Sequence, residues 1–170
     1  MEMFELLLMR HAKSDWSQNL VDFDRPLNAR GRNDALKMGE HLKRLDIMPD
    51  RMIVSNSRRT RETASLLTKN ISVPKDEILL KRSLYLTSYK KICDIAGRYA
   101  EDNLRLLMLA HNPGMDDITY YLCDKRPEIT ANGKLMTTCS IAYFEMNSID
   151  DFKRPGQGKL LDIIRPKSIR

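Results

Sequence analysis

The sequence has 170 residues, of which 42% are hydrophobic and 31% are charged. This length favours a single domain, residues 1–170, with a buried core, and no apolar run approaches the roughly 20 residues that a membrane helix needs. The three cysteines are odd in number and form no CxxC pair, which argues against a disulfide framework or a structural zinc site and favours a reducing, cytoplasmic compartment. The net charge of +6 suits acidic ligands, whereas an aromatic content of 6% gives no sign of single-strand nucleic-acid binding.

The first half of the chain predicts two strand–helix units. Residues 4–9 form an apolar run of strand length. Asn28 then caps a helix whose apolar positions recur every three or four residues. Residues 52–54 form a second short buried strand, and Ser57 begins a second helix. Pro74 closes this unit, and no element is predicted between it and the next helix.

The second half continues the alternation. Ser88 caps a third helix, residues 105–110 form a third buried strand, and Asn112-Pro113-Gly114 leads into a fourth helix over residues 115–122. Two later strands, which can form an antiparallel edge, are residues 140–146 and 159–164. All-apolar strands alternating with helices predict an α/β fold, with a parallel or mixed sheet covered by helices on both faces.

Three of the predicted strands end in residues that can carry chemistry. The first ends in Arg10 and His11, the second in Ser55 with Arg59 four positions later, and the third in His111. In open α/β sheets, ligands bind beyond the carboxyl ends of the strands. If these strands are parallel neighbours, two arginines and two histidines meet at one edge of the sheet.

This combination of residues suits a phosphoryl group. Arginine is always protonated and offers a planar fork of donors that matches phosphate oxygens. A neutral imidazole is a competent nucleophile near pH 7, and nearby arginines should lower the pKa of His11 and keep its attacking nitrogen free. No cysteine follows the first strand and no aspartate cluster suggests a two-metal site, so the sequence does not favour a cysteine or metal mechanism.

Four ordered motifs resemble those of the histidine phosphatase superfamily, also called the phosphoglycerate mutase-like family. The family's Arg-His-Gly signature is similar to residues 8–14, LMRHAKS, where Ala12 replaces Gly, as is common in the SixA-like branch. The family's Pro-Leu-Thr-x-x-Gly segment is similar to residues 24–32, DRPLNARGR, with Asn28 in place of Thr.

The other two motifs lie after the second and third predicted strands. The family's Ser-x-x-x-Arg-Ala-x-x-Thr segment resembles residues 55–64, SNSRRTRETA, and its register selects Arg59 over Arg58 as the phosphate-binding arginine. The second histidine segment resembles residues 110–114, AHNPG, in the form typical of SixA-type phosphohistidine phosphatases.

The resemblance implies a three-layer α/β/α sandwich with a mostly parallel central sheet. It also implies a metal-independent phosphatase without a cofactor, in which His11 attacks phosphorus and forms a transient phosphohistidine. Arg10, Arg59 and His111 would hold the phosphoryl oxygens.

The general acid of many family members has no recognisable counterpart. The short segment between Pro74 and Ser88 offers only Asp76 and Glu77. The candidate acid or pocket residues are therefore Asp22 and Asp24, because the segment after Lys13 can fold over the pocket. A missing acid suggests phosphohistidine as the substrate, since an imidazole leaves more easily than an alkoxide.

Two other functions stay open at this point. One is a small-molecule phosphomonoesterase of the same superfamily, and the other is a non-catalytic module that binds phosphorylated ligands. We expect the partner to be a phosphorylated protein or a small phosphorylated substrate, with no nucleic acid and no membrane involved. We also expect a monomer with an open site that a whole protein can approach.

Overall fold

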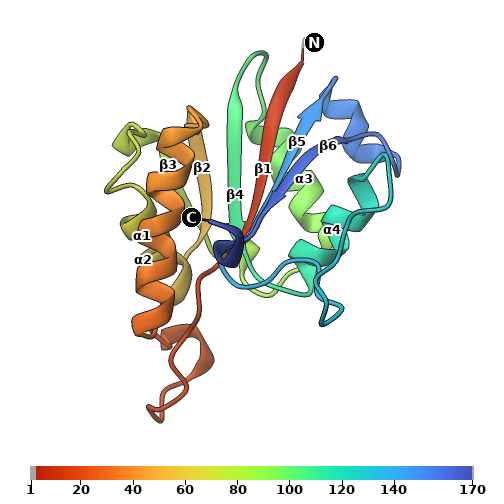
Figure 1. Ribbon diagram of the computed structural model, residues 1–170. Helices are drawn as coiled ribbons and strands as arrows, with labels where there is room; N and C mark the ends of the chain where they lie inside the picture. Colours follow the sequence, from red (N-terminus) through yellow and green to blue (C-terminus); the bar gives the residue numbers. More distant parts are fainter. Residues whose placement is uncertain (1–2, 170) are drawn as a thin grey trace.

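The computed structural model describes residues 3–169, which form a six-stranded sheet flanked by four α-helices (Figure 1). The strands are β1 (Phe4–Arg10), β2 (Arg51–Ser55), β3 (Ile78–Lys81), β4 (Arg105–Ala110), β5 (Ile141–Met146) and β6 (Lys159–Ile164). The α-helices are α1 (Ala29–Arg44), α2 (Arg58–Leu67), α3 (Tyr89–Tyr99) and α4 (Gly114–Leu122). Short 3-10 helices are η1 (Asp22–Asp24), η2 (Lys75–Glu77), η3 (Arg82–Leu84), η4 (Ile149–Lys153) and η5 (Pro166–Ser168).

The strands lie in the order β3-β2-β4-β1-β5-β6. The first four are parallel to one another, whereas β5 pairs antiparallel with β1 and β6 pairs antiparallel with β5. The predicted mostly parallel sheet with an antiparallel edge is thereby confirmed. Because β2, β4 and β1 are parallel neighbours, their carboxyl ends lie together at the lower edge of the sheet in Figure 1.

The strand β3 lies in a segment where no element was predicted, and that part of the sequence analysis is wrong. Its four residues pair with β2 alone at one end of the sheet. Leu80 in its middle is half exposed, and no residue of the strand is fully buried. An edge strand of this kind is too short and too exposed to produce the apolar run that marks a buried strand.

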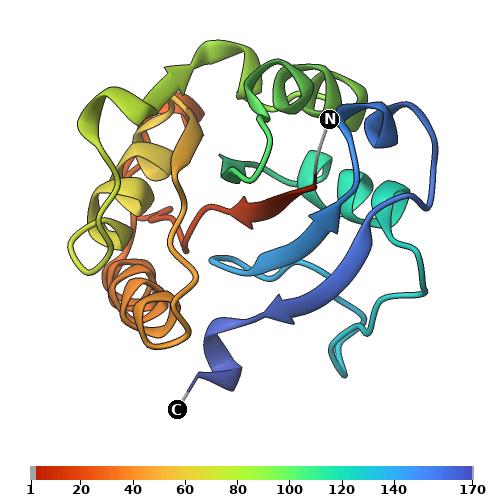
Figure 2. The ribbon, with the colours of Figure 1, turned by 90° about the horizontal axis from the view of Figure 1, so that it is seen from above.

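The apolar strands are explained by the two cores that they separate. Successive side chains of a strand point to opposite faces of the sheet. Leu6 and Leu8 of β1 pack into the core under α3 and α4, whereas Leu7 and Met9 pack into the core under α1 and α2. Seen from above, the two helix pairs lie on opposite sides of the sheet (Figure 2). The predicted three-layer sandwich is therefore present.

The helix starts follow the predicted capping residues. The Asn28 side chain accepts a hydrogen bond from the Gly31 N–H at 2.8 Å, and the Ser88 side chain caps α3 in the same way. Ser57 precedes α2 as predicted, but its hydroxyl pairs with the hydroxyl of Thr60 at 2.7 Å and not with a backbone N–H. Within residues 3–169, no helix is long and apolar enough to cross a membrane.

Candidate active site

The candidate site lies where β1, β2 and β4 end. His11 follows β1, His111 follows β4, and Arg59 lies in the first turn of α2, which follows β2. The three residues are buried, with exposed fractions of 8% for His11, 3% for His111 and 2% for Arg59. The ring centroids of the two histidines are 5.2 Å apart. The adjacency of the three strands thus brings together residues that are 48 and 52 positions apart in the chain.

The hydrogen bonds of His11 define which ring nitrogen is free. Its Nδ1 lies 2.8 Å from the Ala12 carbonyl oxygen, which can only accept, so Nδ1 carries the proton. Its Nε2 then has the lone pair, and it accepts from Nε of Arg59 at 3.3 Å. The unprotonated nitrogen therefore faces the guanidinium group that would hold a phosphoryl group.

The hydrogen bonds of His111 fix its ring in a similar way. Nη2 of Arg59 donates to His111 Nδ1 at 3.3 Å, so Nδ1 is the acceptor. The other nitrogen, Nε2, donates to the Ser55 hydroxyl at 2.8 Å. Ser55, the last residue of β2, thus orients the second histidine.

Both histidines are neutral at physiological pH. Burial lowers the pKa of His11 to about 3, and the charges of His111, Arg59 and Arg10 act in the same direction. The hydrogen bond to Ala12 acts in the opposite direction. Burial and the charge of Arg59 lower the pKa of His111 to about 3 as well, although Asp22 acts in the opposite direction. The predicted lowering of the His11 pKa is therefore present, but burial contributes more to it than the arginines do.

Arg10 lies at the end of β1, beside the two histidines whose pKa values its charge lowers. Its Nη1 donates to the Met136 carbonyl oxygen at 2.9 Å. Its Nε is buried and has no hydrogen-bond partner among the described residues. Burial lowers the pKa of this guanidinium, against the charge of Asp116. Buried donors are normally paired, so an unsatisfied one beside the histidines fits a site for an anionic ligand.

Register along α2 separates the two candidate arginines. Arg59 points into the site, whereas Arg58 lies on the surface and pairs with Glu62 at 2.9 Å. Thr63, one turn after Arg59, accepts from the Ala12 N–H at 3.1 Å and donates to the Arg59 carbonyl oxygen at 2.7 Å. Thr63 therefore ties α2 to the segment that carries His11.

Asp22 reaches the site from η1 and binds Arg59 twice. Nη2 of Arg59 donates to the Asp22 carboxylate at 3.0 Å, and Nη1 donates to the Asp22 carbonyl oxygen at 2.6 Å. The same carboxylate accepts from Arg25 at 2.8 Å and from the Tyr85 hydroxyl. Partial burial disfavours the charged form, but these donors outweigh it and hold the pKa of Asp22 well below its usual value.

Asp24, Glu77 and Trp16 do not reach the site. Asp24 is exposed and makes no side-chain contact with the histidines or Arg59 within residues 3–169. Glu77 pairs with Arg51, which begins β2 at the opposite edge of the sheet. Trp16 is 72% exposed, and the Arg25 guanidinium stacks on its ring at 3.5 Å. Asp22 is thus the carboxylate that the folded segment after Lys13 brings to the site.

Tyr85 is a site residue that sequence reasoning missed. It follows η3, its ring packs edge-on against His111 at 5.4 Å and against Phe23 at 5.0 Å, and its hydroxyl binds Asp22. Burial and Asp22 raise the pKa of this phenol, so it stays protonated. Its one sequence signal is an aromatic residue in a connection that was predicted to be empty.

The arrangement can bind a phosphoryl group and attack it. A neutral imidazole nitrogen lies beside a guanidinium, a second imidazole and a second arginine with a free donor. Charge-assisted donors aimed at the equatorial oxygens are what phosphoryl transfer needs most.

Comparison with known proteins gives both a sequence match and a fold match. Residues 6–84 match the model of the histidine phosphatase superfamily (branch 1), a span that contains His11, Asp22 and Arg59. An uncharacterized chloroplastic protein of Arabidopsis thaliana is 27% identical over 177 residues, which cover 96% of this chain and 78% of that protein.

Two solved structures share the complete fold. The protein histidine phosphatase SixA complexed with tungstate has a TM-score of 0.80 and 20% identity, over 98% of this chain and 99% of that one. A SixA protein described as a phosphohistidine phosphatase from Nakamurella multipartitia has a TM-score of 0.80 and 21% identity, over 98% of both chains. At these identities the likeness shows that the chains share a fold.

Proposed function

We propose that the chain is a phosphatase of the histidine phosphatase superfamily and that it removes the phosphoryl group from phosphohistidine in proteins. The reaction passes through a covalent intermediate on His11 and uses no metal or cofactor. Two structures with the same fold carry the names of protein histidine phosphatases, which supports this choice of substrate.

In the first step, the lone pair on Nε2 of His11 attacks phosphorus. A bond forms between this nitrogen and phosphorus as the bond from phosphorus to the substrate imidazole breaks, and the leaving nitrogen keeps the electron pair. The ring leaves as neutral imidazole when its other nitrogen carries a proton. In the second step, water attacks phosphorus, the electron pair returns to His11 and orthophosphate is released with the protons of the water.

The phosphoryl oxygens are held by Arg59, Arg10 and His111. Arg59 and Arg10 supply donors that are charged at any working pH. A phosphoryl dianion beside His111 raises the pKa of that histidine from about 3, so that the protonated ring can donate to an oxygen. The hydrogen bond from His11 Nδ1 to the Ala12 carbonyl keeps the attacking nitrogen directed at phosphorus.

The state of Asp22 is the observation that carries the choice of substrate. An alkoxide leaving group needs a proton from a general acid, and the acid should have a pKa near the working pH. Asp22 accepts hydrogen bonds from Arg59, Arg25 and Tyr85, which keep it ionised. An ionised carboxylate cannot donate a proton, whereas a phosphohistidine ring that is already protonated on its other nitrogen leaves as neutral imidazole without a proton from the enzyme.

We extend the proposal to a cytoplasmic monomer that acts on a protein. Cys93, Cys123 and Cys139 are free thiols, and burial raises the pKa of Cys93 to about 12 and that of Cys123 to about 11. Unreactive, unpaired thiols fit a reducing compartment.

The test is phosphate release from a histidine-phosphorylated phosphotransfer protein and from phosphoserine, with the wild type and with His11→Ala. We expect fast release from the phosphoprotein, slow release from phosphoserine and no release by the variant. The matched control is His41→Ala, because His41 lies in α1 away from the site and should leave the rate unchanged.

Two results would overturn parts of the proposal. A normal rate in His11→Ala would exclude the covalent mechanism. Equal or faster release from phosphoserine would favour a small-molecule phosphomonoesterase, and Tyr85, whose phenol is protonated at the site, would then be the first proton donor to replace by Phe.

A further inference from the structure

A hollow adjoins the candidate active site on the side of Arg10, which belongs to both. It is a cleft of about 380 Å³, lined by the end of β1, the first turn of α1, the 130–138 loop and η5. Among the residues that the structure describes, five cationic side chains and no carboxylate line it. We call it the basic cleft and define it by Arg10, Lys13, Arg30, Lys134 and Lys167.

The charges of the basic cleft are available to a ligand. Within residues 3–169, Lys13, Lys134 and Lys167 form no ion pair, and Arg30 makes only a long contact of 3.7 Å with Asp34. Lys134 and Lys167 are exposed, so they can meet a charged group without first losing a partner.

The elements that carry these charges are held in place by backbone contacts. The Lys13 carbonyl oxygen accepts from the Asn28 N–H at 3.0 Å, and a Cβ on Gly31 would lie 2.1 Å from the same oxygen, so only glycine lets α1 approach so closely. In the 130–138 loop, the Thr130 N–H donates to the Lys134 carbonyl at 2.8 Å and the Thr130 hydroxyl accepts from the Lys134 N–H at 3.0 Å. The cations therefore lie on anchored segments.

Arg10 joins the basic cleft to the active site. Its charge lowers the pKa of both histidines, it lines the basic cleft, and its buried Nε has no partner within residues 3–169. Lys13 lies two residues after His11. A substrate whose phosphoryl group lies at His11 therefore presents its neighbouring surface to the basic cleft.

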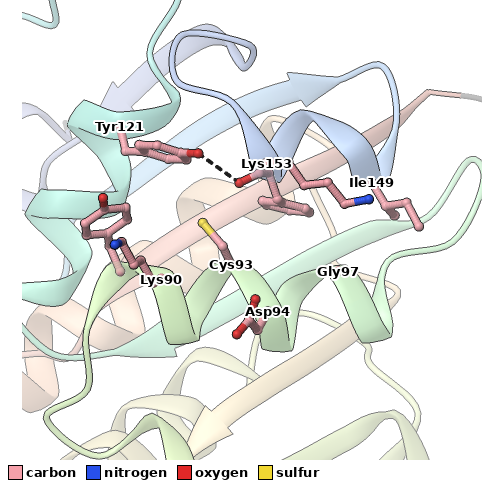
Figure 3. A pocket seen from close by; sticks show the side chains of 9 residues that line it. Lys90, Cys93, Asp94, Gly97, Tyr121, Ile149 and Lys153 are labelled. Carbon is pink, nitrogen blue, oxygen red and sulfur yellow. Dashed lines mark hydrogen bonds between the residues drawn. The ribbon is translucent and has the colours of Figure 1, made fainter.

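A groove elsewhere in the molecule differs from the basic cleft, because acidic residues balance its lysines. A groove of about 590 Å³ lies between α3, α4 and η4, and the Tyr121 hydroxyl donates across it to the Phe152 carbonyl oxygen at 3.1 Å (Figure 3). Its lysines are balanced, because Asp94 also lines it and Lys153 pairs with Asp150 at 2.7 Å. Unbalanced positive charge is a property of the basic cleft.

We propose that the basic cleft is a docking site for carboxylates that flank the phosphohistidine on an acidic protein substrate. The inference rests on the proposed function, because it adds a second contact to the same substrate. Complementary charge at the rim of an interface raises the rate of encounter and excludes partners of the wrong sign more than it raises final affinity. Lys134 and Lys167 are then specificity-determining residues that select acidic phosphoproteins.

The experiment compares two double variants that remove the same charge. Lys134→Gln with Lys167→Gln removes two of the five cations of the basic cleft, and Lys43→Gln with Lys69→Gln removes two exposed lysines, one near the end of α1 and one just after α2. The substrates are a histidine-phosphorylated phosphotransfer protein with acidic residues around its phosphohistidine, the same protein with those residues changed to amides, and N-phosphoimidazole. N-phosphoimidazole has the same leaving group and no acidic flank.

The basic-cleft variant should lower kcat/KM for the acidic phosphoprotein by up to roughly tenfold, through KM, because two exposed ion pairs are lost. The loss should be smaller for the amide protein and for N-phosphoimidazole, and it should shrink at high salt. The control variant should stay within about twofold of the wild type on all three substrates.

The inference is overturned if the two double variants behave alike, or if the basic-cleft variant loses as much activity on N-phosphoimidazole as on the phosphoprotein. Either result can be obtained with a wild type that is fully active. Failure of the wild type to release phosphate from any of the three substrates is a different outcome, and it would overturn the proposed function itself.

Discussion

The two edges of the central sheet use arginine in opposite ways. At the amino edge, Arg51 begins β2 and binds Glu77 at 2.5 Å and Glu101 at 2.9 Å, and Arg105 begins β4 and binds Glu5. These contacts, against burial, raise the pKa of both guanidinium groups. At these positions arginine forms ion pairs with carboxylates of neighbouring elements and so stabilises the amino ends of the strands.

At the carboxyl edge, the arginines retain donors for a ligand. Nε of Arg10 is buried and has no partner in the described part of the chain, and burial lowers the pKa of the guanidinium. Arg59 has one carboxylate partner, Asp22, which lies in the short η1 and whose side chain is 41% exposed. Arginine therefore has a structural role at the amino edge, where neighbouring carboxylates bind it. At the carboxyl edge, where fewer carboxylates bind it, arginine is available for a ligand.

The largest effect expected from this contrast is on catalysis. Arg59→Gln removes charge-assisted donors from the transition state, and loss of one such donor costs about 10²–10³-fold in rate. Arg51→Gln should leave kcat/KM within about twofold of the wild type but lower the free energy of unfolding by about 1 kcal/mol, because it removes the ion pairs with Glu77 and Glu101. Phosphate-release kinetics and urea denaturation of both variants measure the two effects.

The contrast would break if both variants lost activity to the same extent, or if Arg59→Gln were the less stable of the two. A site that keeps a guanidinium buried for a ligand should not depend on it for folding, so Arg59→Gln should be neutral or stabilising.

The second effect is on stability as a function of pH. His11 and His111 have a folded-state pKa of about 3, below the unfolded value of 6.5, so only the unfolded chain takes up these protons as the pH falls. Stability should therefore fall between pH 6.5 and pH 3, by about 2 kcal/mol per histidine between pH 7 and pH 5. Urea denaturation at the two pH values checks this.

The amino edge should respond at lower pH. The hydrogen bond from Arg51 lowers the pKa of Glu77 below 4.5. The stability that this pair contributes is therefore present above pH 4.5 and is lost only as the pH falls through the folded-state pKa of Glu77. Replacement of both His11 and His111 by Gln should remove most of the loss between pH 7 and pH 5. An unchanged loss in that double variant would mean that the histidines are not buried in neutral form.

The third effect is on ligand affinity. Asp22→Asn takes a negative charge away from Arg59, so orthophosphate or vanadate should inhibit about fivefold more tightly, which corresponds to roughly 1 kcal/mol. Asp24→Asn, in the same turn but exposed, is the control and should change nothing. A loss of phosphoserine turnover in Asp22→Asn, with phosphohistidine turnover intact, would identify Asp22 as a general acid and contradict its assignment as an ionised pocket residue.

The smallest expected effect is that of a chelator. If imidazole attack and arginine donors carry out the reaction at the carboxyl edge, activity should be unchanged after exhaustive treatment with EDTA. A loss of activity that added Mg²⁺ or Zn²⁺ restores would show that the donors of this edge are not sufficient.

Much of the fold could be predicted because its signals are local. The apolar runs of β1, β2 and β4, the cap at Asn28 and the turn after His111 each depend on a few consecutive residues. The register of the family segment that residues 55–64 resemble selected Arg59 over Arg58, and the buried position of Arg59 in α2 agrees with that choice. The sequence by itself therefore determined the class of fold, the strand ends and the identity of the histidines and arginines that gather there.

Tertiary structure decided what those residues contact. The order β2-β4-β1 brings Arg59 between the two histidines, and the path of the chain brings Tyr85 to Asp22 across 63 positions. Such contacts produce no recognisable pattern in the sequence, because the residue type at each position reflects only its own local element. The ionised state of Asp22, the tautomers of the histidines and the charges of the basic cleft all arise from segments distant in sequence, and so only the folded chain could determine them.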